Sequence, residues 1–410
     1  MFSFKRFLLF TIIFSTSFAY AESFESLKQK AKKGDSKAQY ELATSYLNAQ
    51  DPILASVWLK RAIKQGNVEA AILLSKLYIK GEGVKKDYKK AEDILIRIKN
   101  KSDEAKKVLA RLYIDESIRN LDEEKLYIDK AVLLLRKLIN KDDAESMVLL
   151  ANIFLNKKTL VRGEVKEAFD LLVKASKLGD LKSIKTLADC FYVGHGCKKD
   201  YKKMLYYLKL AALQGDLESI GKLAYSYENG LGVAPDFKMA FTLHKEAAES
   251  GLPISQLKLG DYYLAGNFVK QSVKVAKEWY NKAATLNYPP AIYKLAMMAD
   301  QGIGEEQNKS KAIELLTKAA TLGEVKAQLE LAYRYKQGDD ISKSNRKAFF
   351  WFEQAAMKNN PNAELELGIY YIKGIGVEKN KKLGYQYLKR SAVHGNKKAK
   401  LMMLNLINEK

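Results

Sequence analysis

Small and large apolar residues recur along this chain with a period of about 36 residues. Each block opens on a Gly-Asp or Gly-Asn pair or on a weaker polar form of it. The block starts are Gly34, Gly66, Lys101, Asp142, Gly179, Gly215, Gly251, Asn287, Gly323, Asn359 and Gly395. The spacing is constant from Gly179 onward and irregular before it. A repeat of this length predicts a solenoid, in which each unit buries its apolar face against its neighbours.

Three positions in each block predict a first helix. The fourth residue after the start is Ala or Ser, the eighth is Leu in every block but the last, and the twelfth is aromatic in nine of eleven blocks. The small residues are Ala38, Ala70, Ala105, Ser146, Ser183, Ser219, Ser255, Ala291, Ala327, Ala363 and Ala399. These positions lie one helical turn apart, so they share one face. We therefore expect close packing of this face on neighbouring helices.

A turn and a second helix follow in each block. Five blocks carry a Gly-x-Gly, which suits a left-handed helix end because glycine has no Cβ to strain. The turns begin at Gly81, Gly194, Gly230, Gly302 and Gly374, and the expected N-caps of the second helices are Asp51, Asp87, Asp200, Asp236, Ser272, Asn308, Ser344 and Asn380. Trp58, Trp279 and Trp351 share a position with leucines of other blocks. We expect them in the core rather than stacked on a ligand.

The repeat resembles a known family in most of its positions. In the block from Gly215 the matching residues are Leu223, Ala224, Tyr227, Gly230, Gly232, Val233, Asp236, Lys238, Ala240, Ala247 and Ala248. They resemble the Sel-1-like repeat, a relative of the tetratricopeptide repeat. The resemblance implies an all-α, right-handed α/α superhelical solenoid of about ten helix-turn-helix repeats, with its first helices on a concave surface. It covers residues 22–410, regular from about 179 and irregular over 101–178, where Ile114–Asn120 and Lys157–Gly163 replace the Gly-x-Gly.

The resemblance also implies a function. Members of the family act as adaptors or scaffolds in protein assemblies, and exported bacterial members resemble host-interaction or envelope proteins. Others are similar to immunity proteins that neutralise secreted toxins such as phospholipases. A cysteine-rich branch resembles weak β-lactam-binding or β-lactam-hydrolysing enzymes, but that branch has a cysteine pair in each repeat, and this chain has two cysteines in total.

The first 21 residues predict a signal peptide. Lys5 and Arg6 precede the apolar run Phe7–Phe14, and Ala19-Tyr20-Ala21 forms a cleavage site. The alternative is an uncleaved N-terminal anchor. No later stretch reaches the roughly 18 apolar residues that a membrane helix needs. We therefore expect a periplasmic or secreted protein.

The charge narrows the expected partners. The chain carries a net charge of +22, which falls to +20 when Lys5 and Arg6 leave with the signal peptide. In an exported protein this favours an acidic protein or an anionic envelope surface over nucleic acid. The alternative is that the excess lysine only keeps a long array soluble.

The cysteines leave three alternatives open. Cys190 and Cys197 bracket the turn that contains His195. They form a disulfide, as an oxidising compartment allows, or remain two buried thiols, or bind a metal together with Asp189 and His195. The spacing matches no usual zinc pattern, and His195 occupies a position filled elsewhere by Glu82, Leu231 and Ile375.

We expect no enzyme, no cofactor and no metal site. The three histidines, His195, His244 and His394, lie far apart in the array and have no evident nucleophile nearby. The Gly-x-Gly turns lack the third glycine and the preceding strand of a dinucleotide site. We find no catalytic group of residues here.

The tenth position of each block is the best candidate for recognition. It varies in chemistry while its neighbours are nearly fixed, so packing does not set it. The candidate partner-binding residues are Lys76, Arg111, Asn152, Asp189, Tyr225, Asp261 and Tyr333, in a row that also holds Thr44, Met297 and Ile369. The alternative is plain solvent exposure. We therefore expect an exported, non-enzymatic scaffold that binds a macromolecular partner on its concave face, with host interaction as one setting. An immunity protein and a cell-wall-active enzyme are the alternatives.

Overall fold

The computed structural model describes residues 24–156 and 161–408. The expected signal peptide lies outside these ranges, as do residues 157–160 of the second irregular turn. Within them the chain consists of helices and short turns, with no strand. No helix in the described ranges combines the length and the apolar character that crossing a bilayer requires. The predicted all-α class is confirmed.

The chain divides into two compact units, Met1–Lys198 and Lys199–Lys410. After a helix over 24–32, the first unit contains α2 (Ser36–Asn48), α3 (Pro52–Lys64), α4 (Val68–Lys80), α5 (Tyr88–Ile98), α6 (Asp103–Arg119), the 3-10 turn η1 (Leu121–Glu123), α7 (Glu124–Ile139), α8 (Ala144–Leu155), α9 (Arg162–Lys177) and α10 (Leu181–Val193). The second contains α11 (Tyr201–Leu213), α12 (Leu217–Asn229), α13 (Phe237–Glu249), α14 (Pro253–Ala265), α15 (Val273–Thr285), α16 (Pro289–Gln301), α17 (Lys309–Thr321), α18 (Val325–Gln337), α19 (Asn345–Ala356), α20 (Pro361–Lys373), α21 (Lys381–Val393) and α22 (Lys397–Asn408).

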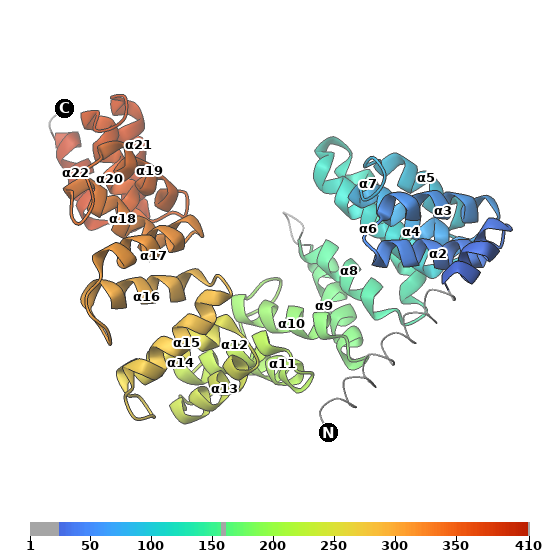
Figure 1. Cartoon of the computed structure of the whole chain (residues 1–410), viewed down its shortest axis with the longest axis horizontal. Helices are drawn as coiled ribbons and strands as arrows, with labels where there is room; N and C mark the ends of the chain where they lie inside the picture. Colours follow the sequence, from blue (N-terminus) through green and yellow to red (C-terminus); the bar gives the residue numbers. More distant parts are fainter. Residues whose placement is uncertain (1–23, 157–160, 409–410) are drawn as a thin grey trace, which may run out of the picture. The chain divides into compact units, whose positions relative to one another are not determined.

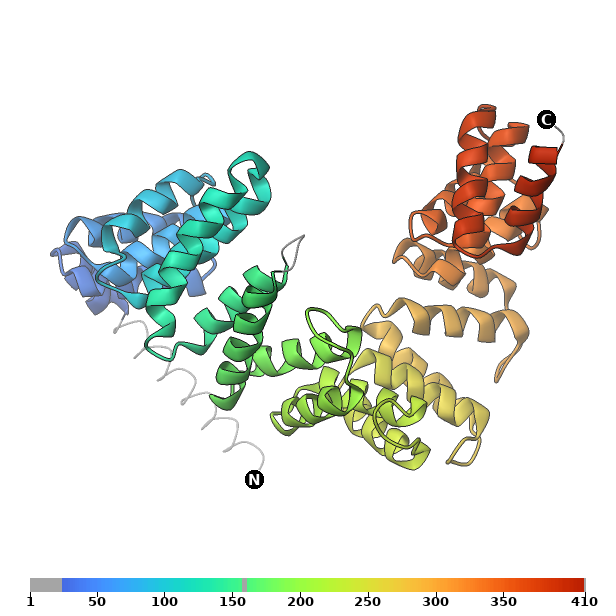
Figure 2. The same ribbon diagram turned by 180° about the vertical axis from the view of Figure 1, so that it is seen from behind.

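Within each unit, consecutive helices pack as antiparallel hairpins, and each hairpin packs on the next (Figure 1). Figure 2 shows the same stacking from behind. The even-numbered helices are the first helices of the repeats and the odd-numbered ones the second helices. This arrangement is a helical repeat solenoid, as the sequence predicts.

The predicted packing positions form the core. Every small residue at the fourth position is buried, and so is every leucine at the eighth position from Leu42 to Leu367. Trp58 and Trp351 are buried as expected. Trp279 is only partly buried, with the Lys282 ammonium 3.7 Å from the ring centroid. Core placement is thus confirmed for two tryptophans and partial for the third.

The ninth position sets how closely the two helices of a hairpin approach. A Cβ placed on Gly260 would overlap the ring of Tyr280, which is fully buried on α15. At the second-helix position of Tyr280, most other blocks have a smaller residue, for example Leu316. Most of them also have alanine at the ninth position, for example Ala296 beside Leu316. The missing Cβ of Gly260 thus makes room for a tyrosine.

We expect Gly260→Ala to destabilise the protein by about 2 kcal/mol, because overpacking forces the Tyr280 ring or the backbone to shift. The pair Gly260→Ala, Tyr280→Leu restores the combination that Ala296 and Leu316 already form. A double-mutant cycle in urea should therefore give a favourable coupling of about 1 kcal/mol or more. Additive effects of the two changes would contradict this contact.

The two glycines of each Gly-x-Gly have different roles. The first is the helix C-cap with positive φ, as predicted, for example Gly374 at 73°. In four of the five turns the second lies against the first residue of the preceding second helix, whereas Gly196 lies against Leu155 and Val165. A Cβ on Gly232 would lie 2.5 Å from the backbone of Tyr201, and one on Gly376 would lie 2.6 Å from that of Asn345. The second glycine therefore makes a contact between repeats, which we call the turn-to-helix contact.

Two blocks make the turn-to-helix contact with side chains instead. Phe268, with φ of 63°, stacks on Phe237, the first residue of α13, at a centroid distance of 5.8 Å. Asp340, with φ of 57°, forms an ion pair of 3.3 Å with Lys309, the first residue of α17. The contact is thus kept in two blocks that lack the second glycine. In each of them the first residue of the preceding second helix has a side chain that matches the residue in place of the glycine.

Side-chain caps begin the second helices as predicted. Asp236 accepts a hydrogen bond from the amide of Met239, and Ser272 accepts one from the amide of Val275. The other expected N-caps, Asp51, Asp87, Asp200, Asn308, Ser344 and Asn380, do the same for their helices. These bonds satisfy amides that the helix itself leaves without an acceptor.

Candidate partner-binding surface

The tenth-position row is exposed along the first helices of each unit. All ten of its residues are partly or largely accessible, whereas the two residues that precede each of them in the helix are buried. In the first unit the row is Thr44, Lys76, Arg111, Asn152 and Asp189, and in the second it is Tyr225, Asp261, Met297, Tyr333 and Ile369. An exposed row beside a fully packed one is available to a partner.

Three charged members of this row bind neighbouring repeats. Lys76 Nζ lies 2.9 Å from Glu104 Oε1, and Arg111 forms an ion pair with Glu145. Asp261 accepts hydrogen bonds from Tyr280 Oη of its own repeat at 2.7 Å and from Lys294 Nζ of the next repeat at 2.8 Å. The sequence predicts that these side chains are available for a partner, but it does not reveal that consecutive first helices bring opposite charges together.

The aromatic members differ from each other. The Tyr333 ring packs edge-to-face on Phe352 at 5.2 Å between centroids, and burial raises the pKa of its hydroxyl. Tyr225 is 45% exposed. Of these two predicted anchors, Tyr225 therefore presents more of its surface to a partner, and Tyr333 contributes more to packing.

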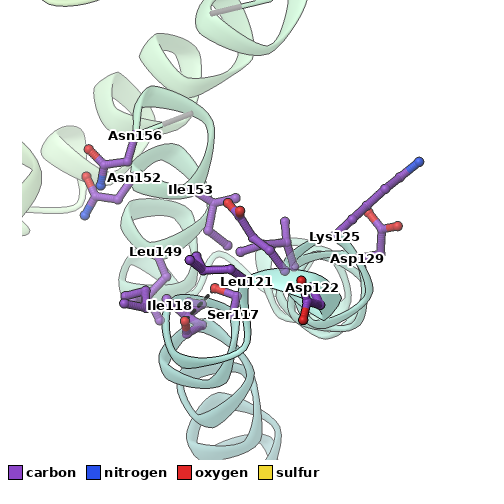
Figure 3. A pocket seen from close by; sticks show the side chains of 13 residues that line it. Ser117, Ile118, Leu121, Asp122, Lys125, Asp129, Leu149, Asn152, Ile153 and Asn156 are labelled. Carbon is purple, nitrogen blue, oxygen red and sulfur yellow. Dashed lines mark hydrogen bonds between the residues drawn. The ribbon is translucent and has the colours of Figure 1, made fainter. Parts of the chain in front are cut away.

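Asn152 takes part in a groove of about 750 Å³. The groove lies between α6, η1, α7 and α8, and Ile118, Leu121, Leu149 and Ile153 gather along it (Figure 3). It arises because Ile114–Asn120 replaces the Gly-x-Gly, so α6 continues to 17 residues where most first helices have 13. The added turn leaves apolar side chains at the surface. The sequence shows that the turn signal is lost, but it does not reveal the groove that results.

The rim of this groove is acidic. Asp122, Glu124 and Asp129 line it together with Lys125, and Figure 3 shows Lys125 and Asp129 extending outward from α7. Among the described residues none of these three acids forms an ion pair. The chain as a whole carries +22. The groove therefore combines an apolar floor with a local charge opposite to that of the protein.

The second unit contains a cluster of polar side chains around the buried His244. His244 Nδ1 on α13 lies 3.1 Å from Ser255 Oγ, and its Nε2 lies 3.8 Å from Glu228 Oε1. Glu228 also accepts hydrogen bonds from Tyr262 Oη and, at 3.0 Å, from Lys258 Nζ. The histidine occupies a position that other blocks fill with Leu, Tyr or Phe, and this substitution was the signal in the sequence.

The expectation that no nucleophile lies near a histidine is therefore wrong for His244. The three histidines are far apart in sequence, but Ser255 near the start of the next first helix, α14, lies beside His244. The resemblance to a Ser-His-Glu triad ends with burial, since His244 is 2% exposed and Ser255 is 0% exposed. A catalytic serine must touch its substrate, and this one has no surface to offer. Burial lowers the pKa of His244 to about 4.

The cysteine turn holds no metal cluster. His195 Nε2 lies 2.7 Å from the carbonyl oxygen of Leu155, and the Cys197 thiol donates to the carbonyl of Cys190 at 3.4 Å. In the described ranges no three His, Cys, Asp or Glu side chains lie close enough together to hold a metal, and this includes Asp189, Cys190, His195 and Cys197.

The two sulfurs are not bonded to each other in the structure. Cys190 is buried, and burial raises the pKa of its thiol to about 12. Because the thiolate is the form that attacks in disulfide exchange, this environment fits the buried-thiol alternative for Cys190, while Cys197 is only partly buried. The disulfide stays a prediction for the oxidised protein.

Comparison with known proteins places the fold in a family. The Sel1 repeat matches residues 36–67, 68–97, 187–216, 218–252, 253–288, 289–324, 325–360 and 361–396, which is more than half of the chain. The chain belongs to the Sel1 repeat family. The longest interval without a match, 98–186, contains α6 to α9 and with them the groove. No curated protein sequence matches the chain.

Solved structures agree on the fold. A protective antigen of uropathogenic Escherichia coli strains with an SLR fold is 25% identical, with a TM-score of 0.52, over 94% of this chain and 90% of its own. A Sel1 repeat protein from Oxalobacter formigenes is 23% identical, with a TM-score of 0.52, over 93% and 89%. An immunity protein from Pseudomonas aeruginosa is 20% identical, with a TM-score of 0.39, over 51% of this chain and 83% of its own.

Proposed function

We propose that this Sel1 repeat protein is an exported scaffold that binds a macromolecular partner through the exposed surface of its first helices, the concave side in the family geometry. The tenth-position row carries the proposal, because its residues vary and are exposed while the two before each of them are buried. Export rests on the pattern of residues 1–21. The net charge of +22 favours an acidic partner or an anionic envelope surface.

Two observations support a binding role without catalysis. Family membership favours a scaffold suited to protein–protein interaction. The one Ser-His-Glu arrangement described above is closed to substrate. A likeness to a protective antigen of a pathogen supports host interaction as the setting. The immunity-protein and cell-wall-enzyme alternatives remain predictions that no feature of the described residues favours.

Affinity capture from periplasmic or host extract tests the proposal. We expect Tyr225→Ala together with Arg111→Glu to weaken capture of the partner at least tenfold, because aromatic and arginine anchors supply most of the binding energy in interfaces. Quantitative mass spectrometry of the eluate measures the loss.

Matched controls lie on the second helices. Tyr206, 58% exposed on α11, replaces Tyr225 as the alanine site. Arg136, paired with Glu167 at 2.7 Å on the neighbouring second helix, replaces Arg111 as the charge reversal. If the first-helix variant retains every partner that the control variant retains, the first helices are not the binding surface.

A further inference from the structure

We infer that the groove of α6, η1, α7 and α8 is a docking site for a cationic amphipathic helix presented by a partner protein. The inference rests on the proposed scaffold function and adds the chemistry of the one segment of the partner that this groove would hold; the net charge of +22 concerns the rest of the surface. It depends on three observations: the spacing of the apolar side chains, their exposure, and the charge of the rim.

The spacing suits a helix. Ile114 and Ile118 lie one turn apart on α6, and Leu149 and Ile153 lie one turn apart on α8. Ridges of side chains with this spacing are the surface into which another helix packs. A helix docked in such a groove places apolar anchors at i, i+3 or i+4, and i+7. A volume of about 750 Å³ accommodates several such side chains.

The exposure indicates a macromolecule as the occupant. Ile118 is 72% exposed and Leu121 is 69% exposed, although both line the groove. Apolar side chains this exposed are not enclosed around a small ligand, whereas a helix laid along the groove would cover them. Burial of this much apolar surface on association is favourable. The site thus has the exposed apolar side chains of a surface that a partner protein would cover.

The acidic rim of the groove indicates that the docked helix is cationic. Asp122, Glu124 and Asp129 bring carboxylates to the rim and, in the described part of the chain, form no ion pair there. Rim charges act locally, because the Debye length at physiological ionic strength is about 8 Å. The positive net charge of the protein would attract an anionic helix to most of its surface, but the acidic rim of this groove would not attract it. A cationic helix has the opposite preference, so the groove can recognise it against the background of the whole surface.

Fluorescence polarisation with the full mature chain tests the docking. The probe is a labelled helical peptide with three leucines on one face, one turn apart, and lysines on the flanks. Its twin has glutamates in place of the lysines. We expect the lysine peptide to bind at least tenfold more tightly than the twin. We expect Ile118→Ala with Leu121→Ala to weaken it at least tenfold, and Asp122→Lys with Glu124→Lys to weaken it and to reduce its dependence on salt.

The controls match exposure and charge. Leu213→Ala removes a side chain that is 84% exposed on α11, and Glu314→Lys reverses an exposed acid on α17. Both should leave binding of the lysine peptide unchanged. Because Ile118 and Leu121 are exposed, circular dichroism should show the groove variants folded. Equal or tighter binding of the glutamate twin, or unchanged binding by the groove variants, overturns the inference.

The outcome is separable from that of the proposed function. If Tyr225→Ala with Arg111→Glu loses the natural partner while the groove variants keep it and the lysine peptide fails to bind, the scaffold stands and the docking site does not. If neither set of variants changes capture, the scaffold function fails. Sedimentation of the protein alone adds one further outcome, since self-association that the groove variants abolish would make a second copy the occupant and overturn the partner proposed here.

Discussion

Replacement of Gly376 by alanine is expected to destabilise the second unit by about 3 kcal/mol. The new Cβ would lie 2.6 Å from the backbone of Asn345, and backbone at the start of a helix cannot yield as the end of a side chain can. The glycine also has a φ of 67°, a conformation that costs a residue with a Cβ about 1 kcal/mol more than glycine. Overpacking adds roughly 1–3 kcal/mol. Urea denaturation followed by circular dichroism measures the loss.

Gly323→Ala is the matched control. Gly323 has a φ of 93°, but a Cβ there would have nothing within 4 Å. This change therefore isolates the conformational cost, which we expect to be about 1 kcal/mol. Equal destabilisation by the two substitutions would mean that the turn-to-helix contact contributes nothing.

Acid is expected to weaken the region around His244. Its folded pKa of about 4 lies below the ordinary 6.5, first because burial disfavours the imidazolium and then because Lys258 repels it, while Glu228 opposes both. Tyr262 faces the same cluster from α14. The unfolded chain therefore binds the proton more readily, and stability falls as the pH drops from 6.5 towards 4. Linkage gives a loss of about 2 kcal/mol between pH 7 and pH 5.

His244→Leu should remove this loss. Leucine is the residue that other repeats carry at the same position, for example Leu316 and Leu388. The measurement is the free energy of unfolding in urea at pH 7 and at pH 5, compared between variant and wild type. His195→Gln, at an exposed position, should leave the wild-type difference intact. An undiminished loss in His244→Leu would show that other groups cause the acid sensitivity.

The fold was predictable because its signals are local and repeated. A fourth-position alanine such as Ala327, an eighth-position leucine such as Leu331 and a cap such as Asp236 each act within a few residues, and a period repeats the evidence many times. The second glycine was interpreted as part of the same cap. Its real contact is with the preceding repeat, which no property of the turn itself reveals.

The candidate site was predictable only in part. Exposure of the tenth position follows from helix periodicity alone, and the structure agrees. The partners of Lys76 and Arg111 depend on how consecutive first helices lie beside each other, so their ion pairs were missed. The groove depends on where α6 ends. The sequence shows that the Gly-x-Gly is missing there, but a missing turn signal does not indicate at which residue the helix ends instead. The His244 cluster joins three helices, and the unusual histidine does not by itself reveal which side chains of the neighbouring helices surround it.

The turn-to-helix contact has a consequence for the ancestry and the engineering of this array. It joins residues 31 positions apart, as in Gly376 with Asn345, Phe268 with Phe237 and Asp340 with Lys309. The two residues of each pair belong to different blocks, so each of these junctions depends on residues from two repeats. A transplanted block that brings Phe268 against Tyr201, or Asp340 against Asn345, would lose its counterpart. The contacts between repeats thus restrict the order of the repeats. A repeat could be moved to another place in the array only if both residues of each turn-to-helix contact were moved with it.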